Sequence, residues 1–211
     1  MKYTEINLDT WDRGEVFRFF IDNMRNVMSM TVDIDVTSLV TFVKAHGLKF
    51  YPTMMWVVSK VINSHDEFKY GWNEDGKLIR WDYISPYYAD FRKENESFVK
   101  LVTEYSDDLK VFHSRFLSDR ERYKNLKAFD LKGVPKNTFD ISCMPWVKYK
   151  NFDIHVFDSG MYLAPVVTWG KYEKENGKII MPLSMNIHHA VADGFHLCRF
   201  FNEVQELIMK V

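Results

Sequence analysis

The feature that most constrains the fold of this chain is an abrupt change of hydrophobic period near its carboxyl end. Over residues 179–189, apolar side chains occupy every second position, which is typical of a strand with one apolar face. After Gly194 the apolar residues recur at helical spacing, at Leu197, Phe200, Phe201, Val204, Leu207 and Ile208. The change of period predicts a long strand, a tight turn and an amphipathic helix.

The turn between that strand and helix carries residues suited to chemistry. Asp193 is placed to cap the helix, and Gly194 gives the turn conformational freedom. His189 falls at the strand end on the apolar face, where a neutral imidazole with a pKa near 6.5 can accept a proton from a bound hydroxyl or thiol. We therefore predict that His189 is a general base facing a cleft. The alternative is a core histidine beside an ordinary helix cap, the reading that we favour for His188 on the opposite face.

The rest of the chain divides into helical and strand-like segments. Helical spacing predicts helices over residues 13–23, from Asp35 to Gly47, from Pro52 onward and over 108–122. Alternation or apolar runs predict strands at 28–34, 79–81, 98–105, 141–146 and 154–157. Segments 162–172 and 179–189 form a hairpin around the pair Asn176-Gly177, and residues 125–137 form an irregular loop.

The order of these segments predicts the fold class. Helices come early and antiparallel strands come late, which favours an α+β fold: a two-layer sandwich with helices on one face of a mixed, mostly antiparallel sheet. The 211 residues, 46% of them hydrophobic, are enough for one well-packed core. We expect a single domain over residues 1–211.

Composition and charge exclude several classes of partner. The net charge is −1 and the basic residues are scattered, which argues against a nucleic-acid groove and a polybasic membrane surface. The amino terminus has no apolar leader, and no apolar run reaches membrane-spanning length, so we expect a cytoplasmic protein. Cys143 and Cys198 lack metal-ligand spacing and are expected to be small buried hydrophobes. Partners should be small molecules or other protein chains, with no bound metal.

Several separate motifs resemble those of the chloramphenicol acetyltransferases over nearly the whole chain. The most specific is His188-His189 followed by Asp193-Gly194-Phe195-His196. The others are Trp11-Asp12-Arg13, Lys49-Phe50-Tyr51-Pro52, Glu94-Asn95-Glu96-Ser97-Phe98, Ser142-Cys143-Met144-Pro145-Trp146 and Gly170-Lys171-Tyr172. The resemblance implies the fold of the CoA-dependent acyltransferases.

The resemblance also implies the reaction and the residues that carry it out. Acetyl would pass from acetyl-CoA, a co-substrate rather than a bound cofactor, to a hydroxyl of chloramphenicol in a ternary complex, which inactivates the antibiotic. His189 would be the general base, Ser142 would donate a hydrogen bond to the oxyanion, and Thr168 would support the intermediate through water. Asp193 would pair with Arg13 and hold the turn. On sequence alone, Thr168 is equally well explained as a strand former.

Family members are trimers with active sites at subunit interfaces, so the resemblance implies a homotrimer in which one subunit supplies the base and its neighbour supplies acceptor-pocket residues. The implied acceptor-site residues are Phe19, Phe20, Phe98, Phe129, Phe152, Ile154 and Val156. The implied CoA-channel residues are Lys49, Tyr51, Trp146, Lys171 and Tyr172. Taken singly, such aromatic residues are more often ordinary core and such lysines are usually only solvated.

The chain departs from the family pattern at the acceptor pocket. Phe20 stands where a tyrosine is usual, Lys100 where a small residue is usual, Asn26 where a cysteine is frequent, and Ala192 replaces a cysteine in the motif. An alternative is therefore a related enzyme that acetylates a different small alcohol, amine or thiol. Two further alternatives are the catalytic core of a dihydrolipoyl acyltransferase, although no lipoyl domain or linker precedes the motifs, and a non-enzymatic trimeric scaffold or binder.

Overall fold

The computed structural model describes residues 2–127, 133–154, 156, 158 and 160–211. Its main layer is a seven-stranded mixed sheet in the order β2-β10-β8-β7-β5-β6, with β9 added to β10. Strand β7 pairs in parallel with β5 and β8, and the other pairs are antiparallel. The strands are β2 (Val27–Asp35), β5 (Ser85–Arg92), β6 (Ser97–Val102), β7 (Thr138–Met144), β8 (Val166–Gly170), β9 (Glu173–Glu175) and β10 (Lys178–His188).

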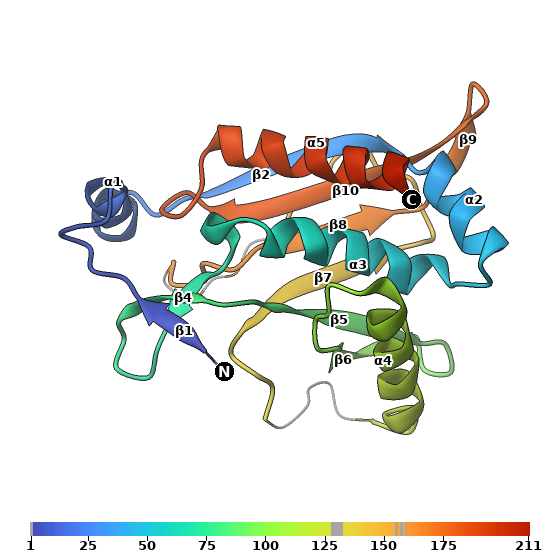
Figure 1. The fold of residues 1–211 in the computed structure, drawn as a ribbon, viewed down its shortest axis with the longest axis horizontal. Coiled ribbons are helices and arrows are strands. Elements are labelled where there is room, and N and C mark those ends of the chain that lie inside the picture. Colours follow the sequence, from blue (N-terminus) through green and yellow to red (C-terminus); the bar gives the residue numbers. More distant parts are fainter. Residues whose placement is uncertain (1, 128–132, 155, 157, 159) are drawn as a thin grey trace.

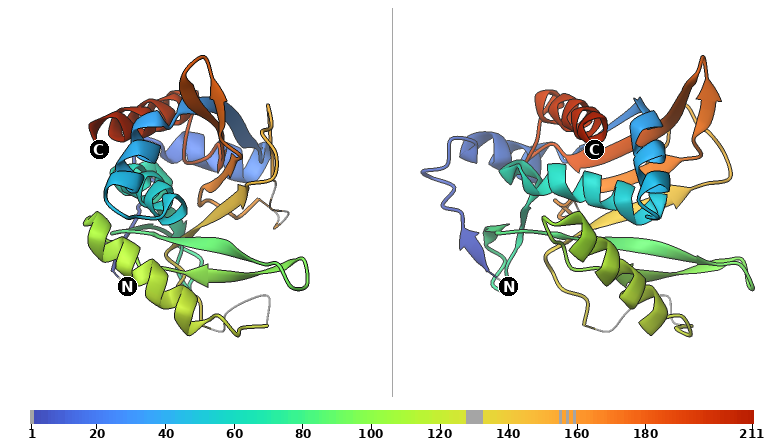
Figure 2. Two further views of the ribbon diagram at one scale, coloured as in Figure 1. Left: turned by 90° about the vertical axis from the view of Figure 1, so that its right-hand side faces the viewer. Right: turned by 45° about the vertical axis from the view of Figure 1, so that its right-hand side comes forward.

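The helices α2 to α5 lie together on one face of this sheet (Figures 1 and 2). They are α2 (Thr37–Ala45), α3 (Phe50–Asn63), α4 (Leu109–Arg122) and α5 (Gly194–Lys210). A short helix α1 (Gly14–Arg18) continues into a π-helix η1 (Phe19–Asn23), and a 3-10 turn η2 (Asp66–Phe68) follows α3. A small sheet joins β1 (Tyr3–Glu5), β4 (Leu78–Trp81) and β3 (Tyr70–Trp72). The predicted α+β class with helices on one face is confirmed.

The core lies between the sheet and these helices. The apolar residues of β10 that the alternation singled out, Met181, Leu183, Met185 and Ile187, are at most 1% exposed and belong to one hydrophobic cluster with α3 and α5. The polar residues on the other face of β10 are also buried, because the segment after β7 covers them: Tyr149 bonds Ser184, and Asn186 donates to the carbonyl of Ile154. Among the described residues, no helix is long and apolar enough to cross a membrane.

Four sequence predictions need correction, and the first is the burial of Cys198, which is exposed on α5. The helix predicted over 13–23 begins as an α-helix but ends in the π-helix η1. The strand predicted at 154–157 is wrong for the residues described there, because Ile154 and Val156 lie in no strand and their segment crosses over β10. Strand β5 was not predicted, because Pro86, Asp90 and Arg92 interrupt its apolar pattern although it lies inside the sheet.

Candidate active site

The turn between β10 and α5 holds His189 in one orientation. The strand ends at His188, so His189 lies in the turn, where its Nδ1 is 2.9 Å from the carbonyl oxygen of Ala192. A carbonyl oxygen can only accept a hydrogen bond, so Nδ1 carries the hydrogen and Nε2 keeps its lone pair. The imidazole stacks on Phe20 at a centroid distance of 4.1 Å and is about a quarter exposed. Nε2 is therefore the atom able to accept a proton.

Arg13 ties the amino-terminal segment to this turn. Its Nη1 donates to Oδ2 of Asp193 at 2.6 Å, and its Nη2 donates to Oδ1 at 2.8 Å, which makes a bidentate pair. The same guanidinium donates to the carbonyl oxygens of His189 and Ala190, at 2.8 and 2.7 Å. The hydrogen bonds from Arg13 hold the pKa of Asp193 below its usual value. The structure thus brings together the two residues that the resemblance paired.

Two other histidines accept hydrogen bonds from backbone N–H groups of the turn. Nδ1 of His188 accepts from Ala190 at 3.0 Å, and Nδ1 of His196 accepts from Asp193 at 2.8 Å. Burial lowers the pKa of both imidazoles. Both rings are neutral in this arrangement, because a protonated Nδ1 could not accept. Sequence reasoning missed the role of His196, although Asp193-x-x-His196 has the spacing of a capping box.

Ser142 lies on the face of the sheet opposite the helices. Its neighbours Ile141 and Phe139 on β7 point into the core, and successive side chains of a strand alternate between faces. Ser142 lines a cavity of about 460 Å³ together with Phe98, Ile154 and Val156, three of the predicted acceptor-site residues. Thr168 is its partner on β8 and is buried. The other lining residues are Ala89, Phe91, Lys100, Asp140, Ile141, Cys143, Met144, Trp146 and Val166.

A second cavity, of about 860 Å³, shares part of its wall with the first. Tyr51, Trp146, Lys171 and Tyr172 line it, as expected of residues along one channel, whereas Lys49 does not. Lys93 and Arg120 also line it, but Arg120 is paired at 2.8 Å with Asp90 of the same wall, so Lys93 and Lys171 are the cations best placed for an anionic ligand. Residues common to both cavities are Ala89, Phe91, Cys143 and Trp146. Burial raises the pKa of the Cys143 thiol to about 12, so it is no thiolate nucleophile at neutral pH.

The remaining predicted acceptor residues are dispersed. Phe19 packs edge-on against Phe20, at 5.2 Å between ring centroids, and both belong to η1 beside His189. Phe152 contacts Tyr149 at 5.7 Å between centroids. Phe129 lies outside the residues that the structure describes. The predicted acceptor site is therefore split between the His189 turn and the Ser142 cavity.

Strand register shows how far apart the two halves lie within one chain. Thr168 pairs with Ser142 on one side and with Ser184 on the other, so Ser142 is level with Ser184. Ser184 precedes His189 by five residues, a distance of about 17 Å along the strand, and β7 is two strand spacings, about 10 Å, from β10. His189 and Ser142 of one chain cannot contact the same reacting atoms.

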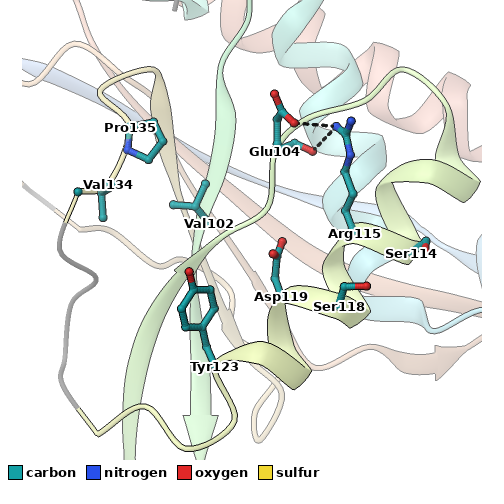
Figure 3. A pocket seen from close by; sticks show the side chains of 10 residues that line it. Val102, Glu104, Ser114, Arg115, Ser118, Asp119, Tyr123, Val134 and Pro135 are labelled. Carbon is teal, nitrogen blue, oxygen red and sulfur yellow. Dashed lines mark hydrogen bonds and ion pairs between the residues drawn. The ribbon is translucent and has the colours of Figure 1, made fainter.

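Another hollow lies between β6, α4 and residues 133–135 (Figure 3). Its volume is about 460 Å³, and an ion pair between Arg115 and Glu104, 3.3 Å long, lies at its edge. None of the predicted site residues that the structure describes lines it. Within the described part of the chain, no cluster of three or more His, Cys, Asp or Glu could hold a metal ion.

Comparison with known proteins gives a consistent result. The family model described as chloramphenicol acetyltransferase matches residues 1–205. Chloramphenicol acetyltransferases from Clostridium perfringens and Staphylococcus aureus are 39% and 36% identical to this chain over 208 residues, which cover 98% of it and 95% and 96% of the relatives.

Solved structures agree in fold. A chloramphenicol acetyltransferase structure superimposes with a TM-score of 0.86 at 22% identity and covers 98% of this chain and 100% of its own. The dihydrolipoamide acetyltransferase of Azotobacter vinelandii has a TM-score of 0.68 at 17% identity and covers 87% and 82% of the two chains. At these identities the two structures show a shared acyltransferase fold.

Proposed function

This chain belongs to the chloramphenicol acetyltransferase family, and we propose that it transfers the acetyl group of acetyl-CoA to a hydroxyl of chloramphenicol, with His189 as the general base. The observation that carries the proposal is the hydrogen bond from Nδ1 of His189 to Ala192, because it leaves Nε2 as a proton acceptor in a turn that Arg13 and Asp193 fix. The family comparisons favour chloramphenicol over a different acceptor.

The reaction follows from these groups. Nε2 of His189 takes the proton of the acceptor hydroxyl while the oxygen attacks the thioester carbonyl, which gives a tetrahedral oxyanion. Ser142 donates a hydrogen bond to that oxyanion, an interaction that is stronger in the transition state than in the ground state. Collapse expels the CoA thiolate, which takes the proton back from the imidazolium. Thr168, next to Ser142 across the strand pair, supports the intermediate through water.

The active site is proposed to form between subunits of a homotrimer. His189, Phe19 and Phe20 come from one chain, and Ser142 with its cavity comes from the next. Support comes from the separation of the two halves within one chain, which strand register sets at more than about 15 Å. A cyclic trimer makes the contact heterologous and closed, so three equivalent sites result.

The two adjacent cavities fit the two substrates. The cavity at Ser142 is lined mainly by apolar side chains and would hold the acceptor, together with Phe98, Ile154 and Val156. The larger cavity would hold acetyl-CoA, with Tyr51, Trp146 and Tyr172 against its apolar parts and Lys171 near its phosphates. We further propose one acetyltransferase domain over residues 1–211, a cytoplasmic location where acetyl-CoA is available, and antibiotic inactivation as the outcome.

The test is acetyl-CoA-dependent thiol release in the presence of chloramphenicol. We expect the wild type to release thiol and His189→Ala to be about 100- to 10,000-fold slower, the usual contribution of a general base. The matched control is His46→Ala, because His46 is an exposed histidine at the end of α2. If the wild type releases no thiol with chloramphenicol, chloramphenicol is not the acceptor. If His189→Ala keeps full activity, His189 is not the general base.

A further inference from the structure

The acceptor cavity contains an ion pair among apolar side chains. Lys100 on β6 and Asp140 on β7 both line the cavity, and Nζ of Lys100 is paired with Oδ1 of Asp140. Their side chains are only 17% and 24% exposed. Nζ also lies 3.7 Å from the ring centroid of Tyr87, and the hydroxyl of Tyr162 donates to Oδ2 of Asp140. Both charged groups are therefore held in fixed positions.

Stability alone does not account for this pair. Two charges removed from water lose hydration, and a largely buried ion pair is often no more stabilising than apolar residues of similar volume. Apolar side chains in place of the pair would match the rest of the wall, because Phe98, Ile154, Val156 and Val166 line the same cavity. A polar end in an otherwise apolar cavity is typical of a group that orients a ligand.

The position of the pair relative to Ser142 sets which part of an acceptor it can reach. Asp140 precedes Ser142 by two residues on the same face of β7, about 7 Å away, and Lys100 is on β6, two strand spacings or about 10 Å from β7. An acceptor whose reacting hydroxyl lies at Ser142 would therefore meet Lys100 with a group at its far end.

We propose that Lys100, held by Asp140, binds a neutral hydrogen-bond-accepting group at the end of the acceptor remote from the acetylated hydroxyl. This inference rests on the proposed function. The ion pair has no net charge, so an anionic group would be repelled by Asp140 and a cationic group by Lys100. In chloramphenicol the nitro group is in this position, across the benzene ring from the propanediol, whereas the amide is next to the reacting end.

The test compares two acceptors, chloramphenicol and its analogue in which hydrogen replaces the nitro group. For the wild type we expect kcat/KM to be about tenfold higher with the nitro compound, because hydrogen bonds to charged groups contribute at least that factor. Equal values for the two acceptors in an active wild type would overturn the inference and leave the proposed function intact. No activity with either acceptor would overturn the proposed function and this inference with it.

A double variant, Lys100→Met with Asp140→Asn, tests the residues themselves. It removes both charges at nearly constant volume, so that no unpaired charge is left in the cavity. We expect the ratio between the two acceptors to fall toward one, whereas the exposed control Lys174→Ala should keep the wild-type ratio. A double variant that keeps the tenfold ratio would overturn the inference. If the double variant does not fold, Tyr162→Phe replaces it, because this change removes only the hydroxyl that donates to Asp140. We then expect a lower ratio between the two acceptors than in the wild type, and an unchanged ratio would overturn the inference.

Discussion

The turn that carries His189 and the sheet face that carries Ser142 differ in how their polar groups are held. In the turn, Arg13, Asp193 and His196 satisfy one another and the backbone within a single chain. Around Ser142, large apolar side chains stay in contact with solvent: the exposed fractions are 45% for Phe98, 39% for Val156 and 63% for Trp146. Clustered exposed apolar side chains mark a binding or association surface. Phe19 and Phe195 beside the turn are likewise 46% and 69% exposed, so both regions present apolar surface, and only the turn also satisfies its charged groups within one chain. This arrangement supports the proposal that the two regions meet across a subunit contact.

Among the variants that distinguish the two regions, we expect the largest loss of kcat when the oxyanion donor Ser142 is replaced. Ser142→Ala should lower kcat about 100- to 1,000-fold, because it removes a hydrogen bond made to charge that develops in the transition state. KM for acetyl-CoA should change little. Steady-state thiol release measures both, with Ser38→Ala on α2 as the exposed control. A Ser142→Ala enzyme with normal kcat would show that Ser142 does not stabilise the oxyanion.

A smaller effect is expected from the residues that only hold the turn. Asp193→Asn should lower kcat about 10- to 100-fold, because the bidentate contact with Arg13 is lost and His189 is displaced. The pH profile of the remaining activity should still follow one imidazole. A variant with near-normal activity and an unchanged turn would contradict a positioning role for Asp193.

The smallest effect concerns the free energy of unfolding at mildly acidic pH. We expect the histidines of the turn, and not the residues of the Ser142 cavity, to lower it as the pH falls. His188 and His196 have lowered pKa values in the folded state, so the unfolded chain takes up protons first as the pH falls below about 6.5. Their contribution is complete above that pH and is lost below it. In His196→Asn, the amide oxygen can still accept the N–H of Asp193 without titrating.

Thermal unfolding between pH 7 and pH 5 checks this difference. We expect the unfolding midpoint of the wild type to fall more than that of His196→Asn, because only the wild type has an imidazole that must be protonated on unfolding. If the midpoints of the two proteins fall equally between pH 7 and pH 5, protonation of His196 does not contribute to the loss of stability.

The sequence predicts local elements well where one period dominates. The alternation in 179–189 and the helical stripe after Gly194 correspond to β10 and α5, and Asn176-Gly177, with positive φ at both residues, forms the hairpin turn. Strand β5 escaped prediction because it is enclosed by neighbours on both edges and carries Asp90 and Arg92, whose charges are paired with each other.

Contacts between segments far apart in the sequence could not be predicted from the hydrophobic periodicity of each segment. Arg13 and Asp193 are at opposite ends of the chain, and only the family resemblance suggested their pairing. The partner of Lys100 was not predicted either, because Asp140 reaches it only through the sheet order β7-β5-β6. The stacking of Phe20 on His189 likewise depends on how η1 packs against the turn.

The measurement that tests the account most directly is complementation between two inactive variants. His189→Ala and Ser142→Ala chains are unfolded together, refolded as a mixture in equal amounts and assayed for thiol release. If each site takes His189 from one chain and Ser142 from the next, random mixed trimers restore about a quarter of the wild-type sites. Activity no higher than the average of the two separately refolded variants would show that both residues must come from the same chain, and would contradict the interfacial site.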